Sequence, residues 1–183
     1  MSLDDGFHRI GSDPYAVPSD AKDGARRLRG QLPAPVTVWT AYGPGGTQTG
    51  ITVSSVLVAE GDAPTILGLI APLSEFWDAV QVSKRFVVHV LGAEQTRAAD
   101  QFALRYPVSP FDGLRVSASE YGPILEDVGT RAEATLTSYV DVGYSLLVRA
   151  TLGEFEFADE PPAPLIHYRG RYFTAASRNR QLP

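Results

Sequence analysis

Cysteine is absent from the 183 residues of this chain. Its absence excludes disulfide bonds, thiolate metal sites and cysteine nucleophiles, and it is compatible with a reducing compartment. The sequence also lacks an apolar run long enough to span a bilayer, and its first residues lack the basic and apolar regions of a secretion signal. We therefore expect a cytoplasmic protein without a membrane anchor.

Positive charge is in deficit, because 16 Lys and Arg stand against 21 Asp and Glu, which gives a formal net charge of −5. This balance disfavours non-specific binding to nucleic acid or to an anionic membrane. The three histidines, His8, His89 and His167, are too scattered to predict a metal site. The GPGG at residues 43–46 lacks the Lys-Ser/Thr of a phosphate-binding P-loop. We expect neither a nucleic-acid partner nor a bound metal.

The remaining composition is that of a folded globular protein, with 44% hydrophobic and 20% charged residues. A chain of this length forms one domain by default and buries a core without disulfides. Residues 1–18 mix Gly, Pro, Ser and Asp without periodicity, so we expect an N-terminal arm there. The single domain is predicted over residues 19–183.

Runs of β-branched residues bounded by Gly and Pro predict most of the secondary structure. Strands are expected at 35–42, 50–59, 64–71, 85–91, 131–140 and 144–158, with two short extended pieces within 164–173. Helices are expected from Ser19 or Asp20 to about Leu32, over 73–84 and over 93–106. The long connection at 107–127, rich in Pro and Gly, is typical of a lid or binding surface.

This order of elements predicts a mainly β fold with peripheral helices. Six to seven antiparallel strands would form a closed or partly closed barrel, which removes exposed sheet edges. A mixed α/β fold with a parallel sheet is the alternative, but parallel pairing needs crossover connections, and most strands here follow one another through short links.

Three segments resemble one known family in order and spacing: GITVSS at 50–55, RFVVHVL at 85–91 and HYRGRY at 167–172. With them, the chain from about Asp23 to Tyr172 is similar to the flavin reductase-like family of FMN-binding split barrels. The resemblance implies a homodimer that binds FMN, or FAD, near the dimer interface and reduces flavin with NADH or NADPH. It also implies a separate flavin-dependent monooxygenase as a partner for the reduced flavin.

Several residues of these segments are candidates for cofactor binding. Hydroxyls and backbone amides at a strand break offer close donors to a flavin, as at Thr52, Val53, Ser54 and Ser55. A phosphate suits the helix start at Ser74. The cationic pair Lys84 and Arg85 can neutralise that phosphate, although both could equally be a solvated pair at a helix end.

The densest polar and aromatic cluster contains His167, Tyr168, Arg169 and Arg171. Rings there can stack on flavin or nicotinamide, and arginine can pair with phosphate. Tyr144 stands where many members of the family have a histidine, so His167 and Tyr144 are candidates for contact with the nicotinamide or the flavin. No catalytic residue is assigned, because the cofactors carry the hydride chemistry. We expect His89, in an apolar strand, to be a core or interface residue.

Two alternatives to a reductase stay open from the sequence. The chain departs from the family pattern at Glu75, Phe76, Tyr144 and His167. These departures favour a binding module that holds flavin or another flat cofactor such as haem without reducing flavin. A dimeric scaffold without a ligand is the second alternative.

Overall fold

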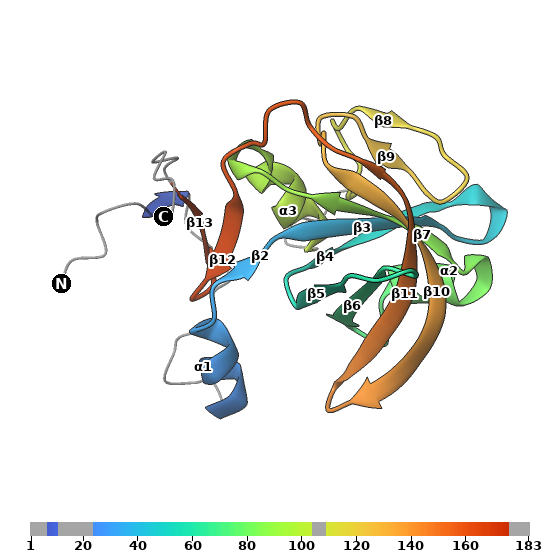
Figure 1. Ribbon diagram of the computed structural model, residues 1–183, viewed down its shortest axis with the longest axis horizontal. Helices are drawn as coiled ribbons and strands as arrows, with labels where there is room; N and C mark the ends of the chain where they lie inside the picture. The colour runs from blue at the N-terminus through green and yellow to red at the C-terminus, as the bar shows by residue number, and fades with distance from the viewer. Residues whose placement is uncertain (1–6, 11–23, 104–108, 176–183) are drawn as a thin grey trace.

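Seven strands form the central sheet, in the order β4-β3-β7-β10-β11-β6-β5 (Figure 1). The computed structural model describes residues 7–10, 24–103 and 109–175. The strand bounds are β3 Thr37–Tyr42, β4 Gln48–Val53, β5 Val56–Ala59, β6 Thr65–Ile70, β7 Arg85–Val90, β10 Arg131–Val142 and β11 Ser145–Glu156. Every pairing in this sheet is antiparallel. This confirms the predicted mainly β fold, and the alternative with a parallel sheet is wrong.

The strands at the two ends of this sheet, β4 and β5, are consecutive in the chain. β4 pairs with β3, whereas β5 pairs with β6. The Thr37 hydroxyl donates to the Val53 carbonyl at 2.7 Å, and the Leu69 N–H donates to the Ser55 carbonyl at 3.2 Å. The prediction of one continuous strand over 50–59 is therefore wrong, because the chain changes its pairing partner at Ser54–Ser55. We call this break between β4 and β5 the split.

Side chains from distant strands of the sheet meet in one apolar core, so the sheet curls into a barrel. Trp39 of β3, Ile66 of β6, Phe86 of β7 and Val148 of β11 all belong to this core. In β11, where the sequence predicts a strand over 144–158, buried side chains alternate with less buried ones at Leu146, Val148, Ala150 and Leu152.

Helix α2 (Glu75–Ser83) packs on the barrel where the sequence predicts a helix over 73–84. Ser74 caps its N-terminus by accepting a hydrogen bond from the Trp77 N–H at 3.2 Å. Its buried side chains are apolar: Phe76, Trp77, Ala79 and Val80. The C-terminal cap is Lys84, which adopts the left-handed conformation with φ 58°.

The helix predicted over 93–106 is divided into η3 (Ala93–Gln95) and α3 (Thr96–Phe102). Residues 104–108 of that prediction lie outside the described residues. Ala99 and Phe102 of α3 belong to a second apolar cluster with Val38 and Leu165. Short strands β8 (Val116–Ser117) and β9 (Ile124–Leu125) form a hairpin within the connection predicted over 107–127.

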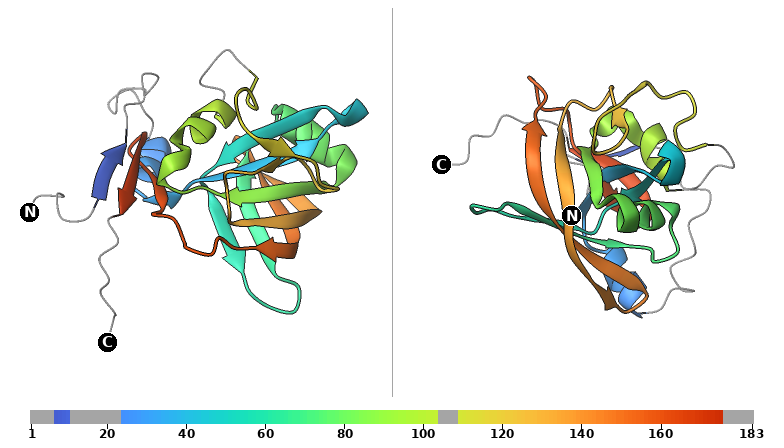
Figure 2. Two further views of the ribbon diagram at one scale, coloured as in Figure 1. Left: turned by 90° about the horizontal axis from the view of Figure 1, so that it is seen from above. Right: turned by 90° about the vertical axis from the view of Figure 1, so that its right-hand side faces the viewer.

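A second, four-stranded sheet has the order β1-β13-β12-β2. Its strands are β1 Phe7–Ile10, β2 Ala34–Pro35, β12 Leu165–Tyr168 and β13 Arg171–Ala175. Figures 1 and 2 show this sheet at one end of the molecule, with α2 towards the other end. Four residues of the expected N-terminal arm thus form β1, while residues 1–6 and 11–18 lie outside the described part of the chain.

A helix α1 (Gly24–Gly30) precedes β2, and its Gly30 carbonyl accepts a hydrogen bond from the Arg169 N–H at 2.9 Å. The predicted start of this helix at Ser19 or Asp20 lies outside the described residues. Among the helices of residues 24–103 and 109–175, none has the length and apolar character required to cross a membrane.

Candidate functional site

The split places two serine hydroxyls at a break in the barrel wall. Ser54 and Ser55 are both half-buried. Neither hydroxyl makes a hydrogen bond to another part of the chain within the described ranges, whereas the backbone on both sides is held by Thr37 and Leu69. The split therefore offers two available donor–acceptor groups on a fixed backbone, as polar recognition of a ligand requires.

The two other candidates in this segment have contacts within the fold. Thr52 donates its hydroxyl proton to the Ala99 carbonyl of α3 at 2.6 Å. Val53 is buried in the barrel core. The structure therefore uses Thr52 to attach β4 to α3 and Val53 to anchor the end of β4, and both residues support the position of Ser54.

Ser74 and Tyr144 lie beyond the ends of strands β6 and β11, and β6 is the strand that bonds to Ser55. The Leu69 N–H bonds to Ser55, and the next residue, Ile70, pairs with Leu146 in β11. The chain reaches Ser74 four residues after Ile70, and Tyr144 stands in the turn just before β11. Neighbouring strands thus bring these candidates to one end of the β5–β6–β11 region.

The groups at this end differ in their availability. The Ser74 hydroxyl donates to the Ala71 carbonyl at 2.8 Å in addition to capping α2. Tyr144 is 99% exposed, so its ring is free to meet a ligand or a partner surface. Glu75 and Asp78 occupy the first turn of α2. They stabilise the helix through its dipole but oppose a phosphate at the same helix end.

Lys84 and Arg85 lie at the opposite end of α2. The helix has nine residues, so its two ends are separated by about 13 Å. The Arg85 guanidinium forms an ion pair with Glu120 and lies over the Tyr121 ring at 5.2 Å. The structure therefore does not bring this cationic pair to Ser74, and the Arg85 side chain already has partners from the connection that contains β8 and β9.

The aromatic cluster predicted near the C-terminus forms the β12–β13 hairpin. The rings of His167 and Tyr172 lie 5.9 Å apart, and the Arg169 guanidinium lies 5.5 Å from the centre of the Tyr168 ring. Arg169 and Gly170 both have positive φ, 51° and 76°, as a tight hairpin turn requires. Because the second sheet and α2 lie towards opposite ends of the molecule (Figure 1), one chain does not bring this cluster to Ser74.

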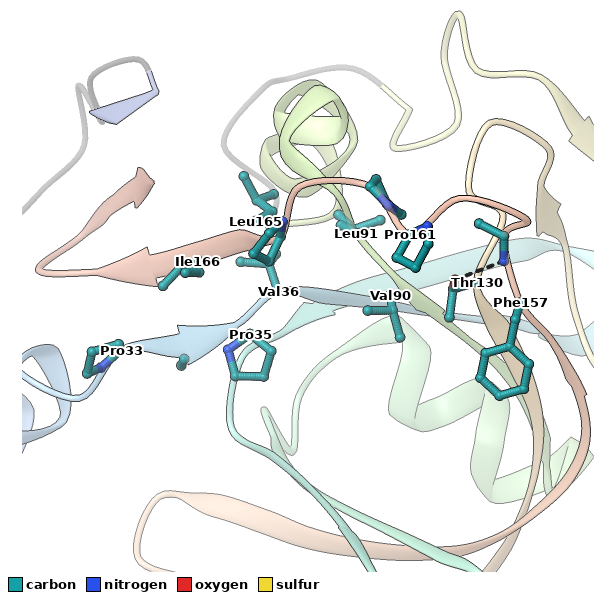
Figure 3. Close-up of a pocket in the computed structure, with 14 residues that line it drawn as sticks. Pro33, Pro35, Val36, Val90, Leu91, Thr130, Phe157, Pro161, Leu165 and Ile166 are labelled. Carbon is teal, nitrogen blue, oxygen red and sulfur yellow. Dashed lines mark hydrogen bonds between the residues drawn. The ribbon is translucent and has the colours of Figure 1, made fainter. Parts of the chain in front are cut away.

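An apolar cleft of about 470 Å³ opens where the second sheet meets the barrel (Figure 3). It is lined by residues of four separate parts of the chain: Pro33, Ala34, Pro35, Val36, Val90, Leu91, Thr130, Phe157, Ala158, Pro161, Pro162, Pro164, Leu165 and Ile166. None of these side chains carries a charge, and Phe157 is 72% exposed at the rim. This cleft has no signal in the sequence beyond the prolines at 161, 162 and 164, which mark one of the segments that line it.

His89 is fully buried in β7, which confirms the prediction of a core residue. Its Nδ1 lies 3.2 Å from the Val38 carbonyl, and its Nε2 accepts the Leu125 N–H at 3.1 Å. Burial lowers the pKa of His89 to about 4, although the bond to Val38 opposes this shift. The neutral ring therefore fastens the β8–β9 connection to the barrel, together with the bond from Thr40 to the Pro123 carbonyl.

Metal ligation finds no support in the described residues, since no group of three or more His, Asp or Glu side chains there is placed to hold an ion. The split fits a different type of ligand. Two half-buried hydroxyls without partners suit a neutral polar molecule such as the polyhydroxyl chain and ring edge of a flavin. The acidic first turn of α2 fits the phosphate of that molecule less well.

The fold is therefore that of a split barrel, with two half-buried serines where the chain passes from β4 to β5. Comparison with known proteins agrees, since residues 28–176 match the model of the flavin reductase like domain. The chain is 30% identical over 172 residues to an NADH:riboflavin 5'-phosphate oxidoreductase from Streptomyces pristinaespiralis, with 90% of this chain and 94% of the relative covered.

Two further relatives have monooxygenase names. The reductase subunit of a flavin-dependent monooxygenase from Mycobacterium tuberculosis is 30% identical, with 80% of this chain and 79% of the relative covered. A crystal structure of a homologue of nitrilotriacetate monooxygenase component B from Mycobacterium thermoresistibile superimposes with a TM-score of 0.77 at 27% identity, covering 87% of this chain and 88% of that one. The protein belongs to the flavin reductase-like family.

Proposed function

We propose that this protein is an NAD(P)H-dependent flavin reductase that binds its flavin at the split. The observation that carries the proposal is the pair of hydroxyls at Ser54 and Ser55, which stand without partners between two anchored strands in the part of the chain that the structure describes. Membership of the flavin reductase-like family supports this assignment. FMN is the expected flavin, with FAD as an alternative, and NADH or NADPH is the hydride donor.

A bound flavin supplies the ring nitrogen N5 as the acceptor of a hydride from the nicotinamide. The chain itself positions the reactants. Ser54 and Ser55 donate hydrogen bonds to the flavin, while Thr52 and Val53 fix the strand that carries them. Tyr144, which is exposed in the turn before β11, offers a ring to cover one of the cofactors. The protein needs no nucleophile for this reaction.

We also propose a homodimer. His167, Tyr168 and Arg169 are candidate contacts for the cofactors, but they lie in the second sheet, at the other end of the same chain from Ser74 (Figure 1). Association with a second copy is an arrangement that can bring this hairpin to the start of α2 at Ser74. The apolar cleft and its exposed Phe157 provide a surface that such a contact would remove from water.

A flavin-dependent monooxygenase is the proposed recipient of the reduced flavin. The support is the Mycobacterium tuberculosis relative, whose name describes a reductase subunit of such an enzyme. We also propose a cytoplasmic location, which rests on the absence of cysteine from the sequence.

A binding module without reductase activity is the second candidate. It is favoured by the charge at the start of α2, where Glu75 and Asp78 oppose the phosphate of FMN and no cationic side chain from Lys84 or Arg85 is near. Such a module would retain flavin or another flat cofactor such as haem.

The test incubates the purified protein with NADH and then NADPH, in the presence of FMN, FAD or no flavin, and follows loss of the reduced nicotinamide. The reductase predicts flavin-dependent loss above a protein-free blank. A cofactor that remains bound through gel filtration without any nicotinamide oxidation would instead support the binding module. Sedimentation of the same sample tests the homodimer.

A further inference from the structure

Gly68, in the middle of β6, lies against the indole ring of Trp39. A Cβ atom at this position would lie 2.4 Å from Trp39 Cη2 and 2.9 Å from Cζ2. The φ of Gly68 is not positive, so the backbone itself does not require glycine. Glycine in a strand interior is otherwise unfavourable. Close approach of the Trp39 ring is therefore the structural reason for glycine at this position.

Trp39 has little freedom to move away from β6. It is 0% exposed, its ring stacks on Phe86 with the ring centroids 4.9 Å apart, and it meets the Phe76 ring edge to face with the centroids 6.2 Å apart. Its indole N–H, in contrast, has no acceptor among the described residues. A buried donor without a partner costs free energy, so the contribution of tryptophan here comes from the length of its ring and not from its N–H.

The ring spans the barrel beside the split. Trp39 belongs to β3, the strand that holds β4, and Gly68 belongs to β6, the strand that holds β5. Gly68 pairs directly with Val56, the residue that follows Ser55. The contact between Trp39 and Gly68 thus joins the two halves of the barrel wall that Ser54 and Ser55 connect.

We propose that the Trp39–Gly68 contact sets the width of the split, so that Trp39 and Gly68 are positioning residues for the flavin site. The proposal rests on the proposed function for the identity of the ligand. A ring of this length keeps β6 at one distance from β3, and a rigid distance keeps both serine hydroxyls in register with a flat ligand. A longer separation would leave one of the two hydrogen bonds to the flavin unformed.

The test uses four variants of the full chain: Gly68→Ala, Trp39→Phe, the double variant, and Gly153→Ala as the matched control. Gly153 lies in β11 of the same sheet, and a Cβ there would make only an ordinary contact, 3.7 Å from Glu133. Phenylalanine lacks the outer indole atoms that approach Gly68, so the double variant has room for the alanine methyl group. Flavin affinity is measured by quenching of FMN fluorescence. The kcat is measured from the loss of reduced nicotinamide at saturating FMN.

We expect Gly68→Ala to raise the Kd for FMN about tenfold while kcat at saturating FMN changes less than threefold. The double variant is expected to recover at least half of that loss on a logarithmic scale, and Gly153→Ala to match the parent. Equal FMN affinity in Gly68→Ala and the parent, or no recovery in the double variant, would overturn the proposal. If Gly68→Ala does not fold, Trp39→Phe alone tests the proposal. We then expect the Kd for FMN to rise at least fivefold, and an unchanged Kd would contradict the proposal.

Hydrogen exchange of the ligand-free protein separates this proposal from the proposed function. In Gly68→Ala the Leu69 amide, which bonds to the Ser55 carbonyl, is expected to exchange faster, and the double variant to restore its protection. If the parent protein reduces no flavin but the exchange results hold, the function fails while the contact still sets the split. If exchange is unaltered, the contact does not set the split, whatever the protein binds.

Discussion

The two segments that most resemble the family, GITVSS at 50–55 and RFVVHVL at 85–91, have different roles in the structure. In the second segment the polar side chains already have partners: Arg85 pairs with Glu120, and His89 bonds to Val38 and Leu125. In the first segment Ser54 and Ser55 have none within the described residues. Both segments match the family equally well, but the polar residues of the second stabilise the fold, whereas the two serines of the first are available to a ligand.

Replacing His89 should give the largest effect, and on stability rather than on flavin binding. His89→Leu leaves the Leu125 N–H and the Val38 carbonyl without their partner in the core. We expect a loss of about 3 kcal/mol in the free energy of unfolding, measured by urea denaturation. A His89→Leu protein as stable as the parent but unable to bind flavin would reverse the roles of the two segments.

The same histidine predicts a pH dependence. Its pKa is about 4 in the folded protein and 6.5 in the unfolded chain, so the unfolded chain binds the proton more readily. Stability is therefore fully present above pH 6.5 and falls as the pH drops towards 4, by about 3 kcal/mol in total. Urea denaturation across this pH range should show the slope in the parent and a shallower slope in His89→Leu. Identical slopes in both proteins would contradict this account of His89.

Removing the two hydroxyls of the split tests the other segment. Ser54→Ala with Ser55→Ala should lower FMN affinity by roughly 10- to 100-fold, since each lost hydrogen bond is worth about 1 kcal/mol. Stability should change little because neither hydroxyl bonds within the described chain. Ser117→Ala, a half-buried serine in β8, is the control for the loss of a hydroxyl. Unchanged affinity in the double variant would refute the assignment of the split.

A smaller effect is expected at the start of α2. Glu75→Gln removes a negative charge beside the proposed phosphate position, so FMN affinity should rise about threefold. Riboflavin lacks the phosphate, and its affinity should stay the same. Fluorescence titrations with both flavins measure this difference. An equal gain for riboflavin would place the phosphate elsewhere.

The smallest effect is predicted for Arg85→Ala. Because the guanidinium is occupied by Glu120 and Tyr121, FMN affinity should change less than about twofold. A tenfold loss of FMN affinity with unchanged riboflavin affinity would show that Arg85 leaves these partners to bind phosphate.

Elements with a periodic pattern of apolar residues could be predicted from the sequence. Features that depend on which distant segment of the chain a residue contacts could not. Alternating apolar residues fix which face of β11 is buried, and Ser74 followed by an apolar stripe fixes the start of α2. The break at Ser54–Ser55 was missed because both flanking strands have the same composition, and only their pairing partners differ.

The candidate site shows the same limit. A motif places Ser54 and Arg85 in the sequence, but the partner of Arg85 is Glu120, 35 residues away, which no local pattern links to it. Trp39 and Gly68 were not candidates either, because their contact crosses the barrel and leaves no periodic signal. The cleft beside Phe157 was missed for the same reason, since four separate parts of the chain line it.

The most direct measurement of the central claim is a crystal structure of the protein with FMN bound. The account predicts that the Ser54 and Ser55 hydroxyls lie within hydrogen-bond distance of the flavin, at the break between β4 and β5. A flavin bound elsewhere, with both hydroxyls out of its reach, would contradict it.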